Sequence, residues 1–173
     1  MPVCRATGQP NRQAEGEALM TLRKVLCPIA FEENSMVALN VAKKIAANQG
    51  ATLVLTHVAP VVMVPMEWTL EPYKAAAEDA QERLQKIAEQ LGADVKCEII
   101  VRVGDPPQGI IGVAVSTKAD LIVMATHGRT GISHFVLGSV AERVVREAPC
   151  PVLTIRPETF AAKKAASGES GDG

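Results

Sequence analysis

The sequence is poor in aromatic residues, which make up only 3% of its 173 residues. Its hydrophobic content of 47% therefore comes mainly from aliphatic side chains, and such cores are typical of parallel sheets that are buried on both faces. Lys and Arg are scattered along the chain, and the formal net charge is -1. Since there is neither a basic stripe nor a set of aromatic rings for stacking on bases, we expect no nucleic-acid partner.

Long hydrophobic runs are also missing. The apolar stretches fall far short of the roughly 20 residues that a membrane-spanning helix needs, so we expect no membrane partner. Residues 1–20 lack the basic and then apolar layout of a secretion signal. The cysteines Cys4, Cys27, Cys97 and Cys150 match neither a zinc pattern nor a CxxC redox motif. Cys27 and Cys97 fall inside strand-like runs, where we interpret a free thiol as a small hydrophobe, and we expect a reducing, cytoplasmic location.

Both ends of the chain have the composition of disordered segments. Residues 1–21 are polar and show no hydrophobic period, and residues 158–173 are small, polar and rich in Gly and Ser. Such segments cannot bury enough apolar surface to fold alone. We expect a disordered N-terminal extension, one folded domain over residues 22–157, and a disordered C-terminal tail.

Strand-like and helix-like runs alternate through this domain. The expected strands are Lys24–Ile29, Thr52–Val58, Val95–Val103, Asp120–Thr126 and Val152–Arg156. The expected helices run from a cap at Asn34 or Ser35 to Gln49, over Tyr73–Leu91, over Pro106–Lys118 and from Ser139 to Ala148.

The segment Pro106–Lys118 is the ambiguous one, because propensity alone leaves helix and strand equal. Pro106 and Pro107 suit the first turn of a helix, and the alternation on either side requires a crossover. We therefore predict a helix. The sum is an α/β fold, a doubly wound, Rossmann-like five-stranded parallel sheet with helices on both faces. Such sheets bind ligands at the carboxyl ends of their strands, which directs attention to the segments after Ile29 and Thr126.

A glycine-rich loop, from Ala125 to Ser139, joins the fourth expected strand to the fourth expected helix. Gly128, Gly131 and Gly138 permit backbone conformations and a close ligand approach that a Cβ would prevent. Gly138 also directly precedes a helix start, where free N–H groups favour an anion. The GK[ST] ending of a Walker loop is missing. These features leave phosphate binding and an ordinary flexible loop as equal alternatives.

The charge of this stretch favours phosphate. No Asp or Glu occurs from Leu121 through Ala141, whereas His127, Arg129 and His134 do. Arg129 is the side chain best suited to pair with a phosphate, with a solvated arginine as the equal alternative.

Two other features near the expected ligand edge have structural interpretations. Glu32 and Glu33 could form an acid/base pair, but their position before a helix favours an interaction with its dipole. His57 ends the second expected strand, where we expect a packed or hydrogen-bonded imidazole rather than a ligand-binding one.

The stretch ATHGRTGISHFVLGSVAERVVREAPCPVLTIRP resembles the C-terminal signature of the universal stress protein family, which contains a G-x2-G-x9-G-[ST] nucleotide-binding loop. The KVLCPIAF opening, the GATLVLTHV second strand and the GDP turn at Gly104 to Pro106 match as well. The likeness covers nearly all of residues 22–157 in the right order. It implies the strand order 3-2-1-4-5 and ATP, or another adenine nucleotide, as ligand, with Mg²⁺ possible alongside.

The resemblance also implies roles for individual residues. Gly128, Gly138 and Ser139 would hold the phosphates, and Val140 would contribute its backbone at the helix start. Met124 and Ala125 would lie near the ribose, with Pro28 and Ile29 near the base. A homodimer joined through the last strand, Val152–Arg156, is implied too, and would cover an otherwise exposed sheet edge.

The chain departs from the family pattern at two positions. Ala125 stands where the signature has its first glycine, a small change. Ala30 stands where nucleotide-binding members often carry an Asp that helps to hold the adenosine. Losing one hydrogen bond to a ligand costs about 1 to 3 kcal/mol, or roughly 5- to 150-fold in affinity.

The sequence supports a regulatory stress-response module that binds an adenine nucleotide and has little or no turnover. No nucleophile triad, metal cluster or activated cysteine is evident, so we expect no enzyme. The main alternative, favoured by Ala30, is a structural or partner-binding homodimer that no longer uses nucleotide. A weak ATPase is the third possibility. The sequence identifies neither the stress nor the protein partner.

Overall fold

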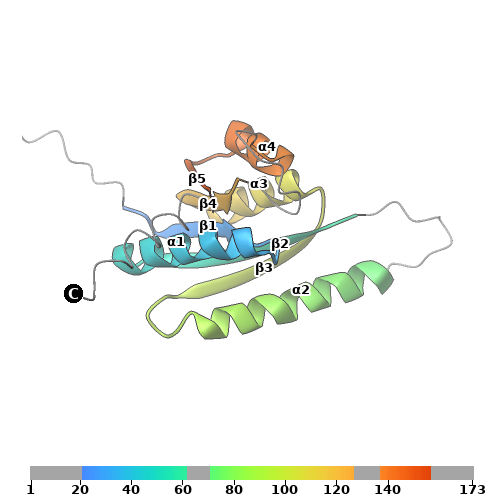
Figure 1. Ribbon diagram of the computed structural model, residues 1–173, viewed down its shortest axis with the longest axis horizontal. Helices are drawn as coiled ribbons and strands as arrows, with labels where there is room; N and C mark the ends of the chain where they lie inside the picture. The colour runs from blue at the N-terminus through green and yellow to red at the C-terminus, as the bar shows by residue number, and fades with distance from the viewer. Residues whose placement is uncertain (1–20, 62–70, 127–136, 157–173) are drawn as a thin grey trace, which may run out of the picture.

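The structure is a computed structural model that describes residues 21–61, 71–126 and 137–156 (Figure 1). The predictions of disorder for residues 1–20 and 158–173 lie outside the described residues. In chain order the elements are β1 (Lys24–Pro28), α1 (Glu33–Gln49), β2 (Thr52–Pro60), α2 (Glu71–Gln90), β3 (Cys97–Gly104), α3 (Pro106–Thr117), β4 (Leu121–Ala125), α4 (Ser139–Glu147) and β5 (Val152–Ile155). None of the helices in these ranges is long and apolar enough to cross a membrane.

The strands form one parallel sheet in the order β3-β2-β1-β4-β5. This confirms the predicted α/β class, the five-stranded parallel sheet and the 3-2-1-4-5 order. The order reverses beside β1, where Leu26 is in register with Val54 of β2 on one side and with Ile122 of β4 on the other. The carboxyl ends of β1 and β4 therefore flank the switch point, where open sheets of this kind bind ligands.

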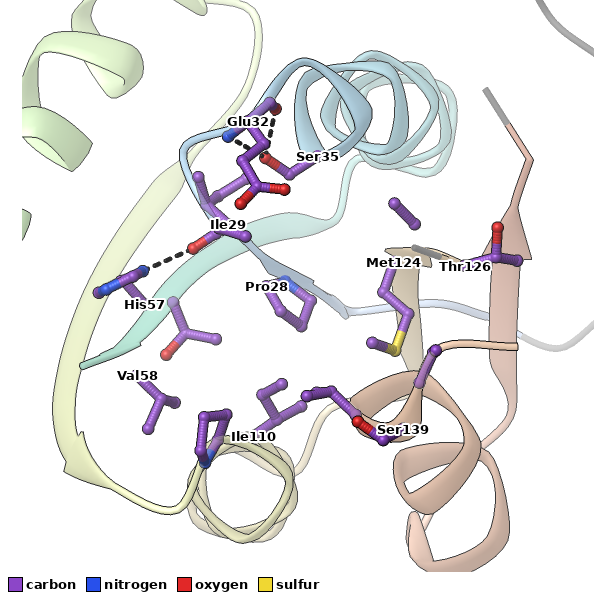
Figure 2. Close-up of a pocket in the computed structure, with 17 residues that line it drawn as sticks. Pro28, Ile29, Glu32, Ser35, His57, Val58, Ile110, Met124, Thr126 and Ser139 are labelled. Carbon is purple, nitrogen blue, oxygen red and sulfur yellow. Dashed lines mark hydrogen bonds between the residues drawn. The ribbon is translucent and has the colours of Figure 1, made fainter. Parts of the chain in front are cut away.

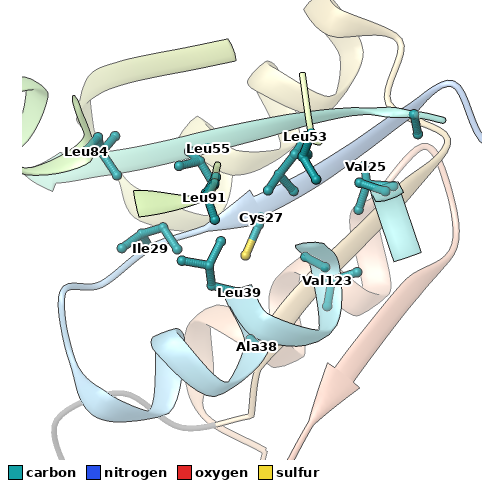
Figure 3. Packing of buried hydrophobic residues seen from close by; sticks show 14 of the residues in the cluster. Val25, Cys27, Ile29, Ala38, Leu39, Leu53, Leu55, Leu84, Leu91 and Val123 are labelled. Carbon is teal, nitrogen blue, oxygen red and sulfur yellow. The ribbon is translucent and has the colours of Figure 1, made fainter. Parts of the chain in front are cut away.

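Side chains alternate between the two faces of the sheet, so consecutive residues of β1 enter different cores. Val25, Cys27 and Ile29 pack with α1 and α2, as Figure 3 shows. Leu26 packs on the opposite face, in a second cluster with residues of α3 and α4. Figure 1 shows the resulting three layers, with the sheet between the two pairs of helices. Both faces are covered, which explains the nearly continuous aliphatic strands.

The ambiguous segment is a helix, as predicted. Its N-cap, Asp105, has a side chain that accepts a hydrogen bond from the backbone N–H of Gln108 at 3.4 Å. Pro106 occupies the first turn, where a missing N–H costs nothing. Lys118 ends the helix in the left-handed conformation, with φ 54°. Capping and burial thus outweigh the β-branched composition of the segment.

Two local predictions were wrong. The N-cap of α1 is Glu32 rather than Asn34 or Ser35, because the Ser35 hydroxyl reaches back to the Glu32 backbone and begins the helix earlier. The spacing of apolar residues in α4 also predicts Val145 on one face with Ala141 and Val144, but Val145 is 47% exposed while the other two are buried. The nine-residue helix covers only a narrow strip of the sheet.

Candidate functional site

A cavity of about 360 Å³ lies at the carboxyl ends of β1, β2 and β4 (Figure 2). This size is within the roughly 300–1,000 Å³ range of small-molecule sites. Its walls include the predicted site residues Pro28, Ile29, Met124, Ala125, Gly138, Ser139 and Val140. The remaining two, Gly128 and Arg129, lie outside the described residues, as do His127 and His134. The structure thus brings together predicted residues that are more than 100 positions apart in the chain.

The middle of the cavity is apolar. Ile29, Val58, Ile110 and Met124 line it, and each has less than a tenth of its surface exposed. These side chains come from the residue after β1 and from β2, β4 and α3, so no short stretch of sequence reveals the wall that they form. Apolar walls with a few polar groups at fixed places are the usual design of a ligand site.

One end of the cavity is formed by the start of α4. Gly138 is the N-cap, in extended conformation, and no side chain caps it among the described residues. The first N–H groups of a helix have no partner within the helix and carry its positive dipole end. Gly138, Ser139 and Val140 all border the cavity here. The arrangement suits an anionic group of a ligand.

Hydrogen bonds fix this end to the sheet. The backbone N–H of Gly138 donates to the carbonyl oxygen of Thr126 at 2.8 Å, which holds these two residues next to each other. The backbone N–H of Thr126 in turn donates to the carbonyl oxygen of Ile155 at 3.0 Å. The start of α4 is therefore held to the ends of β4 and β5, which keeps its N–H groups in a constant position.

The opposite end is the turn between β1 and α1. The backbone N–H of Ile29 donates to the carbonyl oxygen of Thr56 at 2.8 Å, which extends the pairing with β2 by one residue. Ala30 borders the cavity with a methyl group. Phe31 then adopts the left-handed conformation, with φ 59°, which is costly for a residue with a Cβ. This reversal brings Glu32 back to the cavity as a lining residue.

His57 supports the same turn. Its Nδ1 donates to the carbonyl oxygen of Ile29 at 2.7 Å, and its ring lies 4.6 Å from that of Phe31, centroid to centroid. The expectation of a hydrogen-bonded imidazole is confirmed. His57 nevertheless lines the cavity as well, so it has both a structural position and access to a ligand.

Sequence reasoning missed several lining residues. Glu32, Thr56, His57, Pro106 and Ile110 all border the cavity but were not predicted to bind a ligand. Glu32 could have been predicted to line the cavity, because it follows the first strand at the carboxyl edge of the sheet. Ile110 could not, since its place depends on how α3 packs on β2.

The described residues do not bring three His, Cys, Asp or Glu side chains together as a metal site. The thiols of Cys27, Cys97 and Cys150 are free. Burial raises the pKa of each, most strongly for Cys27. A raised pKa leaves less thiolate, so these three thiols are weak nucleophiles near neutral pH.

Comparison with known proteins supports the family resemblance. The family model described as the universal stress protein family matches residues 21–156. A universal stress protein of Methanocaldococcus jannaschii is 41% identical over 142 residues, which cover 78% of this chain and 82% of that protein.

Solved structures of universal stress proteins have the same fold as this chain. A universal stress protein from Lactobacillus plantarum superposes with a TM-score of 0.64 at 25% identity, covering 78% of this chain and 98% of its own. A universal stress protein solved in complex with cAMP superposes with a TM-score of 0.55 at 27% identity, covering 79% of this chain and 98% of its own.

Proposed function

The chain belongs to the universal stress protein family, and on that premise we propose that it is a stress-response regulatory module that binds ATP or a related adenine nucleotide in the cavity between β1 and β4. The observation that carries the proposal is the uncapped start of α4 at one end of an apolar cavity at the switch point. A helix start of this kind stabilises a phosphate, and apolar walls suit a base. The relative solved with cAMP supports an adenine nucleotide as the ligand class.

The proposed arrangement assigns each part of the nucleotide to a wall of the cavity. Gly138, Ser139 and Val140 would contact the phosphates, together with Gly128 and Arg129 outside the described residues. The ribose would lie against Met124 and Ala125, and the base against Pro28 and Ile29. Any Mg²⁺ would enter with the phosphates.

Little or no turnover is part of the proposal. Hydrolysis needs a base or a metal that positions a water beside the phosphate. His57 donates a hydrogen bond through Nδ1 to the Ile29 carbonyl, and it lies at the other end of the cavity from α4. It is therefore far from the place where the phosphates would bind. Nucleotide occupancy would instead act on the surface that a protein partner contacts.

A homodimer through β5 completes the proposal. Among the strands that the structure describes, β5 lies at the edge of the sheet and pairs only with β4. Its Leu153 is 38% exposed. An exposed edge strand is a template for pairing with another strand, and a second copy would cover it.

The proposal is tested with the purified protein. Denaturation should release an adenine nucleotide that chromatography identifies, or else calorimetric titration of the nucleotide-free protein with ATP, AMP and cAMP should give saturable binding. Phosphate release measured over hours should stay close to the rate of a blank. Absence of binding up to millimolar ATP would contradict the proposal.

That negative result would favour the second candidate, a structural or partner-binding homodimer that does not use nucleotide. Its supporting observation is Ala30, which offers only a methyl group to the cavity where nucleotide-binding members often carry a carboxylate. Both candidates are homodimers, so the nucleotide titration separates them, and light scattering of the nucleotide-free protein tests the dimer that they share.

A further inference from the structure

The two ends of the cavity differ in charge. At the α4 end no side chain of the described residues caps the helix start, and no acidic residue occurs from Leu121 through Ala141 of the sequence. The end beside α1 has a carboxylate, since Glu32 lines the cavity there. Figure 2 shows this carboxylate turned from the start of α1 toward the cavity, on the opposite side from Ile110 and Ser139. A ligand that fits both ends must itself be polarised.

The backbone that carries Glu32 is well fixed. The Ser35 hydroxyl accepts from the Glu32 N–H at 3.2 Å and donates to the Glu32 carbonyl at 2.7 Å. The turn before it contains Phe31, held against the His57 ring. A rigid turn fixes the position of the Glu32 backbone, so the carboxylate extends from a defined point beside the cavity.

The neighbouring polar side chains are engaged with the protein backbone. The hydroxyl of Thr56 donates to the carbonyl oxygen of Ile100 at 2.8 Å, and that of Ser35 donates to the carbonyl oxygen of Glu32. Nδ1 of His57 donates to Ile29. A carboxylate has about four lone-pair positions, so Glu32 can keep its contacts within the protein and still accept from a ligand.

We propose that Glu32 is the specificity-determining residue of this site, accepting hydrogen bonds from donor groups of a nucleoside while the phosphates lie at the start of α4. This inference rests on the proposed nucleotide binding. Phosphate oxygens at neutral pH are acceptors, so the donors of ATP are the ribose hydroxyls and the amino group of the base. A bound nucleotide is thereby oriented, because the reverse orientation would bring its phosphates against the Glu32 carboxylate.

The experiment compares Glu32→Gln with Glu33→Gln. The two changes remove the same charge from neighbouring positions at the start of α1, but Glu33 does not line the cavity. Calorimetry measures the affinity of each variant for ATP and for inorganic tripolyphosphate, which has no nucleoside. We expect Glu32→Gln to weaken ATP binding about tenfold, since a charge-assisted bond becomes a neutral one. It should leave tripolyphosphate binding unchanged or stronger.

Two ATP analogues identify the donor. The 2′,3′-dideoxy analogue lacks both ribose hydroxyls, and inosine triphosphate lacks the amino group of the base. Whichever group Glu32 accepts from, its removal should weaken binding to the wild type and have a smaller effect on Glu32→Gln, as in a double-mutant cycle. If neither analogue shows this coupling, the inference is overturned.

The outcomes separate the inference from the proposed function. Equal ATP affinity in Glu32→Gln and Glu33→Gln would overturn the role of Glu32 and leave nucleotide binding intact. A wild type that binds no ATP would overturn both. Circular dichroism and thermal unfolding establish that each variant is folded. Glu32→Asp, which keeps the charge but shortens the side chain, is a second variant and should also weaken ATP without affecting tripolyphosphate.

Discussion

The guanidinium carbon of Arg83 lies 3.8 Å from the centroid of the Phe31 ring. This contact joins the middle of α2 to the turn after β1. Phe31 also contacts His57, which donates a hydrogen bond to the Ile29 carbonyl at the cavity wall. Side chains from α2 and β2 therefore pack on both sides of a strained residue, Phe31, which has a left-handed conformation in the turn after β1.

The contact between Arg83 and Phe31 predicts that their contributions to the free energy of unfolding are coupled. Cation–π pairs contribute about 0.5–1 kcal/mol at exposed sites, so Arg83→Ala should lower the free energy of unfolding by roughly that amount. In a Phe31→Leu background the same change should have almost no effect. Urea denaturation of the four proteins of this cycle measures the coupling. Additive effects would show that the contact contributes nothing to stability.

An acidic residue at the start of α4 should separate stability from binding. In Ser139→Asp the new carboxylate interacts favourably with the helix dipole, worth about 0.3–1 kcal/mol, so the melting temperature should hold or rise. The same charge should repel phosphates and weaken ATP binding about tenfold or more. Ser116→Asp, at an exposed position near the end of α3, is the control. Unchanged ATP affinity in Ser139→Asp would place the phosphates elsewhere.

Glycines three residues apart in α3 should respond in opposite ways to alanine. A Cβ at Gly109 would lie 2.7 Å from both methyl carbons of Val58, whereas a Cβ at Gly112 would have no atom of the described residues within 4 Å. Gly109→Ala should destabilise by about 1–3 kcal/mol through overpacking, and Gly112→Ala should stabilise by about 0.5–1 kcal/mol through helix propensity. Thermal unfolding measures both. Adding Val58→Ala to Gly109→Ala should recover part of the loss, and no recovery would contradict the proposed clash.

The buried thiol of Cys27 predicts a stability loss at high pH. Burial raises its pKa in the folded state, so above about pH 8.5 the unfolded chain releases a proton that the folded chain keeps. The unfolded state is then favoured by about 1.4 kcal/mol per pH unit. Between about pH 7.5 and 9.5, the wild type should lose roughly 1 kcal/mol more unfolding free energy than Cys27→Ala. Parallel losses in the two proteins would show that Cys27 does not titrate on unfolding.

The proposed dimer is sensitive to charge on β5. Leu153→Glu should give a monomer by light scattering at micromolar concentration, because a buried unpaired carboxylate would disfavour strand pairing. Val115→Glu makes the same kind of change at a valine of α3 that is 59% exposed, and should remain dimeric. A monomeric wild type would refute the dimer through β5.

Much of the fold could be predicted from sequence because each element carries a local pattern. The aliphatic run at β4 and the spaced Ala80, Leu84 and Leu91 near α2 report burial directly, and these three side chains are buried in the structure. The order of the strands required the family resemblance, since local patterns do not say which strands are neighbours. The helix at 106–117 was predicted from its two leading prolines and from the elements around it, because the propensities of its other residues did not decide between helix and strand.

The residues of the candidate site that could be predicted are those with a local sequence motif or a family likeness. Gly138 and Ser139 were identified because a glycine before a helix start has a local physical meaning, and Pro28 and Ile29 because the family likeness pointed to the end of β1. Val58 and Ile110 were not found, because they meet only when α3 packs on β2.

The sequence by itself determined the alternation of elements, the aliphatic core and the acid-free stretch from Leu121 through Ala141. These properties depend on residues close together in the chain. Tertiary structure alone decided that Glu32 faces the same cavity as Ser139, and that Arg83 and His57 both contact the Phe31 ring beside it. The physical reason is that such contacts join residues from different elements, and their distances are set by how helices pack on the sheet.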